Sequence, residues 1–421
     1  MIDRQVFDTV TQLWASRLQI MNTRRRLKRY TYGDQWGDIV CDDEGRRVVE
    51  SELLRRNGRR PITNNLIRRL VKTLVGRFRE MGINEGWYDA TLAVSPGLSE
   101  LDELDSRLFE EFLISGMAIQ RIADDNPLAG GAPAVENVNP ECFFCNDFCD
   151  PRGTDIDLIG MLHDMSPAEV RRRFGGTTAK SREALSRILA ASGNDIAAAP
   201  STMARFHTPA RGRVRIIEAW SREYDTNGNI SWRVRWFAPN GALISSYYSP
   251  WRHRAHPFVV KFYPLTDGEI HSFVEDVVDQ QRYINRIVVL LDRMMATSAK
   301  GVLVFPQGQK IKGMEWDEVA RLWASPDGII PIQGEMDGMP QQISGTNGDM
   351  SIYRLLEMEL KLFEQSAGVG PALLGSSNVL SSARGAEMYS ATVENATIAL
   401  ADIFYTFRSL LRHRDAKLSQ L

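Results

Sequence analysis

The stretch CFFCNDFC at residues 142–149 is the most chemically suggestive in the chain, because it places three cysteines close together. A structural zinc ion takes four ligands, usually in two close pairs. The fourth ligand here would have to be His163 or the distant Cys41, and the spacing fits no standard zinc motif. Alternation also puts Phe144 and Phe148 on one face, as in a β-strand. We therefore favour a packed strand over a metal site at Cys142, Cys145 and Cys149.

Other signatures of catalysis are missing from the sequence. It contains no Gly-x-x-x-x-Gly-Lys-Ser/Thr phosphate loop, no Gly-x-Ser-x-Gly elbow and no His-Glu-x-x-His motif. Gly368-Val-Gly370 lacks the strand-then-helix context of a dinucleotide site. The acidic group Glu275, Asp276 and Asp279 is better explained as a solvated helix face than as a two-metal centre. We predict no enzyme activity, no catalytic residues, no metal and no cofactor.

Charge is nearly balanced overall, with 51 Lys and Arg against 53 Asp and Glu, but it is distributed unevenly. Residues 1–80 carry 18 basic and 10 acidic side chains, and residues 301–349 carry 3 and 7. The basic run at 24–29 could meet phosphates, but a solvated helix end is the favoured interpretation. Neither a secretory signal nor an apolar run of membrane-spanning length is visible. These features predict a soluble protein made in the cytoplasm, without a membrane partner.

The longest periodic pattern covers residues 269–300. Two rows repeat every seven residues along it, and Gln281 interrupts the second: Ile270, Val277, Ile284 and Leu291; Val274, Gln281, Val288 and Met295. Spacings of three and four place both rows on one face of an α-helix, which would be roughly 45 Å long at ~1.5 Å per residue. Such a face needs a partner.

The preceding sequence predicts an α+β body that leads into this helix. Helices are expected at 3–30, 61–79, 99–115 and 179–193, with a short Ser166-capped helix before the last of these. Strands are expected at 117–122, within 134–163, and at 213–223, 230–238, 243–249 and 257–263. The aromatic cluster from Tyr30 to Trp36 should pack, and residues 194–212 should form a mobile loop.

After the long helix, a module of about fifty residues is predicted before the helical pattern resumes. It contains strands at 301–305 and 328–332, a short helix at 315–324, and a glycine-rich part at 333–349 with little pattern. Helices follow at 350–366 and 382–414, separated by a loop. A module of this size has little core of its own, so we expect it to pack on the rest of the chain or on other copies.

This order of elements resembles that of the phage portal proteins, the rings at one capsid vertex through which DNA is packaged and released. The stretch from Glu275 to Asn285 looks like their first stem helix, and 370–375 looks like the turn after the second. Residues 382–387 look like the start of the final helix. The segment from Tyr30 to Trp36, with Asn64-Asn65 and the helix to Arg79, is similar to the family's N-terminal part. The resemblance covers nearly the whole chain, although the short C-terminus implies a short or absent crown.

The resemblance implies a domain plan and a set of partners. Residues 1–265 would be the wing, 266–300 and 350–367 the stem helices, 301–349 the clip, and 368–421 the channel (tunnel) loop and C-terminal helix. The chain would form a homo-oligomeric ring of twelve copies in the virion, assembled in the host cytoplasm. Its implied partners are double-stranded DNA, the terminase large subunit, head–tail connector proteins, and the major capsid and scaffolding proteins.

Site residues follow from the same resemblance. The channel loop would be Ser376, Ser377, Asn378, Val379, Leu380, Ser381 and Ser382 with Arg384, and Lys300 would lie in the stem channel. Docking of the motor and connector would use Gln307, Lys310, Lys312, Trp316 and Asp337 of the clip. Two other functions stay open from the residues alone: a nucleic-acid-processing enzyme with a coiled-coil arm, and a cytoplasmic coiled-coil scaffold.

Overall fold

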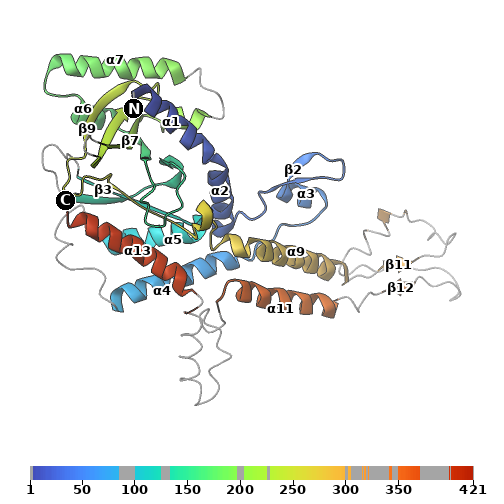
Figure 1. Ribbon diagram of the computed structural model, residues 1–421. Helices are drawn as coiled ribbons and strands as arrows, with labels where there is room; N and C mark the ends of the chain where they lie inside the picture. The colour runs from blue at the N-terminus through green and yellow to red at the C-terminus, as the bar shows by residue number, and fades with distance from the viewer. Residues whose placement is uncertain are drawn as a thin grey trace, which may run out of the picture. The chain divides into compact units, whose positions relative to one another are not determined.

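The computed structural model describes residues 3–84, 100–124, 133–196, 203–224, 228–298, 302–304, 315, 317–318, 321, 341–343, 349–369, 398 and 400–420. The chain divides into two compact units, one of residues 1–32, 67–276 and 368–421, and the other of residues 33–66 and 277–367. Helices and antiparallel sheets are mixed (Figure 1), which confirms the predicted α+β class.

The first unit contains two antiparallel sheets. One has five strands in the order β5 (Phe143–Cys145), β6 (Leu158–Met165), β7 (Val214–Tyr224), β8 (Ile230–Phe237) and β9 (Leu243–Tyr248). The other has three, in the order β10 (Phe258–Phe262), β3 (Met117–Asp124) and β4 (Pro133–Asn137). The alternating patterns therefore predicted the strands of both sheets. The helices of this unit are α1 (Asp3–Ser16), α2 (Leu18–Tyr32), α4 (Leu66–Asn84), α5 (Leu101–Ser115), α6 (Pro167–Phe174), α7 (Ala179–Ile196), α8 (Ala204–His207) and α13 (Ala401–Leu418).

Two apolar clusters cover the two faces of the five-stranded sheet. On one face lie Trp220, Trp236, Phe143 and Phe258 with their neighbours. On the other face, helix α1 contributes part of the second cluster, whose members include Val6, Phe7, Val10, Trp14, Phe206, Ile217 and Phe237. Val6, Val10 and Trp14 of α1 are buried in this second cluster.

Aromatic rings join three helices of the first unit. Phe109 of α5 stacks on Phe78 of α4 at 4.7 Å and on Phe404 of α13 at 5.4 Å between ring centroids. Phe407 of α13 meets Phe109 edge-on at 5.0 Å. Such ring pairs add about 1 kcal/mol each beyond their buried area. The C-terminal helix is therefore part of the core of this unit.

Two predicted boundaries need correction. The helix expected over 3–30 is two helices that break at Arg17. The expected loop 194–212 includes the end of α7 and the helix α8, whose Phe206 is fully buried. The helix end predicted at 115 is confirmed, because Gly116 ends α5 with a left-handed φ of 69°.

The second unit holds a small hairpin and two long helices (Figure 1). The hairpin strands are β1 (Ile39–Cys41) and β2 (Arg47–Val49), followed by α3 (Glu50–Arg56). The long helices are α9 (Glu275–Ser298), whose first two residues belong to the first unit, and α11 (Asp349–Ser366). Between them, β11 (Val302–Val304) pairs with β12 (Gln341–Ile343). Strand β12 lies in the stretch expected to have little pattern, and the strand expected at 328–332 falls outside the described residues.

Candidate functional site around helix α9

Helix α9 begins at Glu275, six residues later than the periodic pattern suggested. Ser272 and Glu275 form a reciprocal cap: the Ser272 hydroxyl accepts from the Glu275 amide at 3.1 Å, and the Glu275 carboxylate accepts from the Ser272 amide at 3.5 Å. The Val274 amide donates to the Leu113 carbonyl at the end of α5. The start of α9 is therefore fixed by its own cap and by α5.

The seven-residue rows of α9 are buried over their first part. Val277, Ile284 and Gln281 are fully buried, whereas Met295 near the end is 61% exposed. The prediction that this face needs a partner is confirmed at its beginning. Along these rows burial reaches Leu291 and is lost at Met295.

The polar residue that interrupts the row, Gln281, binds the chain segment that precedes α4. Its amide donates to the Asn64 carbonyl at 2.7 Å and to the Asn285 side chain at 3.1 Å, and its carbonyl accepts from the Leu66 amide at 2.9 Å. Asn285 in turn accepts from the Asn64 amide at 3.1 Å and donates to Gln35 at 2.5 Å. Because buried polar groups are costly unless they are hydrogen-bonded, this network specifies how segment 33–66 lies on α9.

A cluster of ion pairs also holds segment 33–66 on α9. Arg286 donates to the Glu50 carboxylate at 2.6 Å, and Arg282 lies 3.5 Å from the same carboxylate. Glu50 is the first residue of α3 and is buried. The sequence alone gives no indication of this pairing, because Glu50 lies more than 200 residues before these arginines.

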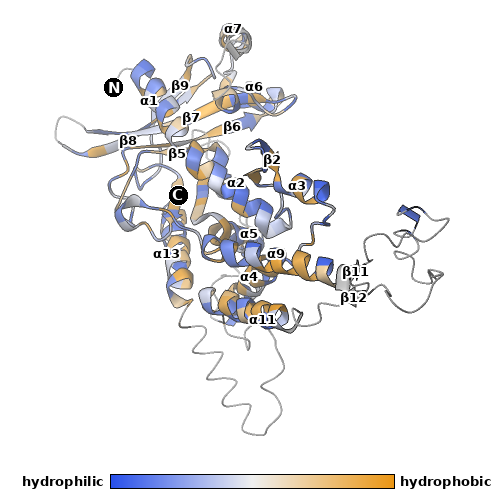
Figure 2. Ribbon diagram, turned by 90° about the vertical axis from the view of Figure 1, so that its right-hand side faces the viewer, coloured by the Kyte–Doolittle hydropathy of each residue, from blue (hydrophilic) through white to orange (hydrophobic). Residues whose placement is uncertain are grey.

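Helices α9 and α11 lie side by side in both views (Figures 1 and 2). Tyr353 of α11 contacts Met295 of α9, with its hydroxyl 3.8 Å from the sulfur. Six large apolar side chains of the two helices are at least 40% exposed: Tyr283, Leu290, Met295, Tyr353, Met358 and Leu362. Large exposed apolar groups of this kind mark a candidate contact surface on these two helices.

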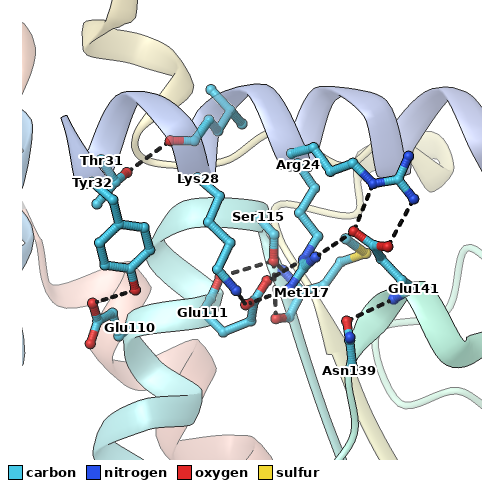
Figure 3. A network of polar contacts seen from close by, with 12 residues as sticks. Arg24, Lys28, Thr31, Tyr32, Glu110, Glu111, Ser115, Met117, Asn139 and Glu141 are labelled. Atoms are coloured by element: carbon cyan, nitrogen blue, oxygen red, sulfur yellow. Dashed lines mark hydrogen bonds and ion pairs between the residues drawn. The ribbon is translucent and has the colours of Figure 1, made fainter. Parts of the chain in front are cut away.

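Three cations of the basic run of α2 form ion pairs within the first unit. Arg24 is 5% exposed and donates to Glu111 at 2.6 and 2.8 Å and to Glu141 at 3.2 Å. Arg25 forms two further bonds of 2.8 Å to Glu141, and Lys28 lies 3.4 Å from Glu111 (Figure 3). Hydrogen bonding to Arg25 lowers the pKa of Glu141, against the effect of burial. These cations fasten α2 to α5 and to the turn at Glu141, so both earlier interpretations are corrected for these three residues.

A buried carboxylate links the two sheets of the first unit. Glu218 of β7 accepts from Arg121 of β3 at 2.9 Å and from Trp220 at 2.8 Å, and lies 2.6 Å from His163. Burial alone would raise its pKa, but Arg121 and His163 outweigh burial and hold the pKa well below the usual range. A His–carboxylate pair of this kind resembles part of a catalytic site, yet the neighbouring cation and indole already occupy the carboxylate.

A second buried pair fastens helix α13. Arg414 donates two bonds of 2.6 Å to Asp105 of α5, which also accepts from Gln120 at 2.9 Å. Burial raises the pKa of Asp105 despite these partners. Charge pairing therefore adds to the aromatic contacts that hold the C-terminal helix.

The three cysteines do not converge on a metal. Cys145 is buried and accepts from Arg17, Cys142 is half-buried, and Cys149 is exposed. His163, the suggested fourth ligand, binds Glu218 instead. In the part of the chain that the structure describes, no group of three or more His, Cys, Asp or Glu side chains is arranged to hold a metal ion.

A cavity of about 490 Å³ lies in the first unit, and Cys142 is one of its lining residues. Its charged lining residues pair with one another, Arg25 with Glu141 and Arg215 with Asp164 at 2.6 Å. These pairs give the cavity no obvious catalytic group.

The predicted site residues themselves fall outside the described residues. This applies to the channel loop with Arg384, to Lys300 and to the docking residues of the clip. The structure therefore reports on the helices that flank these segments, and the assignments stay predictions.

Comparison with known proteins supplies the family. The model of the phage P22-like portal protein family matches residues 98–414. A search of curated proteins gave no match. Among the described residues, no helix is long and apolar enough to cross a membrane. With three quarters of its length matched, the chain belongs to the phage P22-like portal protein family, a structural, non-enzymatic family of oligomeric rings at the virion capsid vertex.

Proposed function

We propose that this chain is the subunit of a ring that forms the channel for genome packaging and ejection. Residues 1–265 form its wing, 266–300 and 350–367 its stem helices, and 301–349 its clip. Residues 368–421 provide the channel loop and the C-terminal helix. The observation that carries this proposal is the family match over 98–414, which spans all of these parts except the N-terminal portion of the wing and the last residues.

The stem assignment has physical support in α9 and α11. Their exposed apolar side chains suit a wall in which each subunit packs against its neighbours, because a head-to-tail interface that closes by rotation generates a ring. The balance of charge along 269–300, five acidic and four basic side chains, suits a channel through which DNA slides. Each phosphate contact by Lys or Arg would add salt-sensitive affinity and slow that movement.

The clip is proposed as the docking surface for the terminase large subunit during packaging and for the head–tail connector afterwards. Pairing of β11 with β12 supports a folded module between the two stem helices. The docking residues would be Gln307, Lys310, Lys312, Trp316 and Asp337, in a segment whose net charge of −4 suits a basic partner surface.

Electron microscopy and mass measurement of the purified full-length chain, expressed with its scaffolding protein, test the ring. We expect closed rings near twelve times the 47.5 kDa subunit mass. A stable dimer under those conditions would overturn the proposal and favour a coiled-coil scaffold.

The channel loop has a separate test. Shortening 376–382 should leave ring formation intact while packaging or DNA retention falls. Loss of rings in that variant would instead assign the loop a structural role, and unchanged packaging would remove it from the DNA path.

A further inference from the structure

The hairpin of β1 and β2 is small, and no third described strand pairs with it. Its strands have three residues each, and among the described strands they pair only with one another. Asp42 closes the turn by accepting from the Glu44 and Arg46 amides. An isolated two-stranded hairpin is marginally stable in water, so additional packing is expected.

One face of this hairpin presents apolar side chains to water. Ile39 and Val49 are direct cross-strand partners, and they are 62% and 39% exposed. Side chains two residues apart share a face, so Cys41 and Arg47 lie on the same side as this pair. The opposite face carries the half-buried pair Val40 and Val48.

The segment that bears the hairpin is held firmly on α9. The buried bonds of Gln281 and Asn285 fix its ends through Gln35 and Asn64. Glu50, directly after β2, pairs with Arg286. An apolar surface held in this way loses little conformational entropy when it binds a partner.

The charges of the segment favour a protein partner over a polyanion. Residues 33–66 carry six basic and seven acidic side chains, and near the hairpin Arg46 pairs with both Asp42 and Glu44. A ring places a second copy of the chain beside every subunit, and the anchor on α9 moves the hairpin together with a stem helix.

We propose that the face formed by Ile39, Cys41, Arg47 and Val49 docks on the neighbouring subunit, so that segment 33–66 acts as a clasp between adjacent copies. This inference rests on the proposed ring. It adds a specific contact surface that lies outside the stem helices and the clip.

Cys41 provides a direct probe, because it is exposed on the docking face itself. In a Cys142→Ser/Cys149→Ser background, the remaining Cys145 is buried, and burial raises the pKa of its thiol to about 11. A benzophenone maleimide should therefore label Cys41 selectively. Illumination of assembled rings should give a ladder of covalent dimers and higher species, and rings without such products would overturn the inference.

The substitution Ile39→Lys tests how much the Ile39 side chain contributes to ring assembly. Covering an isoleucine side chain is worth about 1.5–3 kcal/mol, so its replacement should raise the concentration needed for half-assembly by about tenfold or more. Asp43→Lys, at an exposed turn position of the same hairpin, also adds positive charge and should change that concentration by less than about threefold. Circular dichroism of the unassembled variants checks that both fold.

The outcomes separate this inference from the proposed function. If the wild-type chain forms no ring, the proposed function fails. If rings form, Ile39→Lys assembles like wild type and Cys41 gives no crosslinks, only the clasp is refuted. Similar weakening by Ile39→Lys and Asp43→Lys would assign the effect to charge and also overturn the apolar contact.

Discussion

Replacing Lys417 by Met should alter how the stability of the first unit depends on pH. Lys417 lies in the last turn of α13 and is buried, and its ammonium nitrogen donates to the carbonyls of His256 at 3.1 Å and Phe258 at 2.6 Å. Burial lowers its pKa from 10.5 to about 7. Three histidines interact electrostatically with Lys417: His253, His256 and His413.

The direction in which the unfolding free energy changes with pH follows from the protons bound by the folded and the unfolded chain. Between pH 7 and pH 10.5 the unfolded chain holds a proton on this lysine that the folded chain has released, so this group makes stability rise with pH. The slope approaches ~1.4 kcal/mol per pH unit for one proton. The wild-type free energy of unfolding should therefore gain about 2–3 kcal/mol over the Met variant between about pH 7.5 and about pH 9.5.

Urea unfolding followed by tryptophan fluorescence measures this difference, with the variant and wild type compared at each pH. Lys180→Met, at an exposed position of α7, is the matched control and should leave the slope unchanged. Parallel pH profiles for wild type and the Lys417→Met variant would refute the argument, since they would mean that Lys417 keeps its proton when folded.

Three further substitutions test the buried contacts. Gln281→Leu leaves the Asn64 carbonyl without its donor, so protease cleavage within 33–66 should accelerate at least about tenfold. An unchanged digestion pattern would count against this anchor. Glu218→Gln leaves Arg121 buried without its main counter-charge and should cost about 3–5 kcal/mol of unfolding free energy in urea; a loss below about 1 kcal/mol would contradict its role. Gly116→Ala adds a Cβ that lies 2.9 Å from an Ile270 methyl, at a residue whose φ is +69°. The melting temperature should therefore fall by several degrees. No fall would show that the turn can relax.

The spacing of apolar residues predicted most of the described helices and strands, because it indicates which side chains are buried. The caps at Ser166 and Gly116 are also confirmed, since a cap depends on residues within one turn of it. Prediction was weaker where a local sequence pattern is compatible with two different structures. The break at Arg17 lies inside an otherwise helical pattern, and its guanidinium contacts Cys145 and Met117 far along the chain.

The absence of catalytic motifs and the order of elements were readable from the sequence, and the family match agrees with the interpretation they supported. The residues assigned to DNA and motor contacts rest on resemblance. The candidate clasp could not be predicted, because nothing in the pattern of 33–66 indicates that it lies on α9.

The sequence by itself determined the long amphipathic helix α9 and the polar position that interrupts its apolar row. Only the tertiary structure decided what that position does: Gln281 binds Asn64 and Leu66, more than 200 residues earlier in the chain. The same holds for Arg24, whose charge is visible in the sequence and whose partners Glu111 and Glu141 are not. Apolar periodicity is a property of one element, whereas a hydrogen bond or ion pair requires a second group that the fold brings into place.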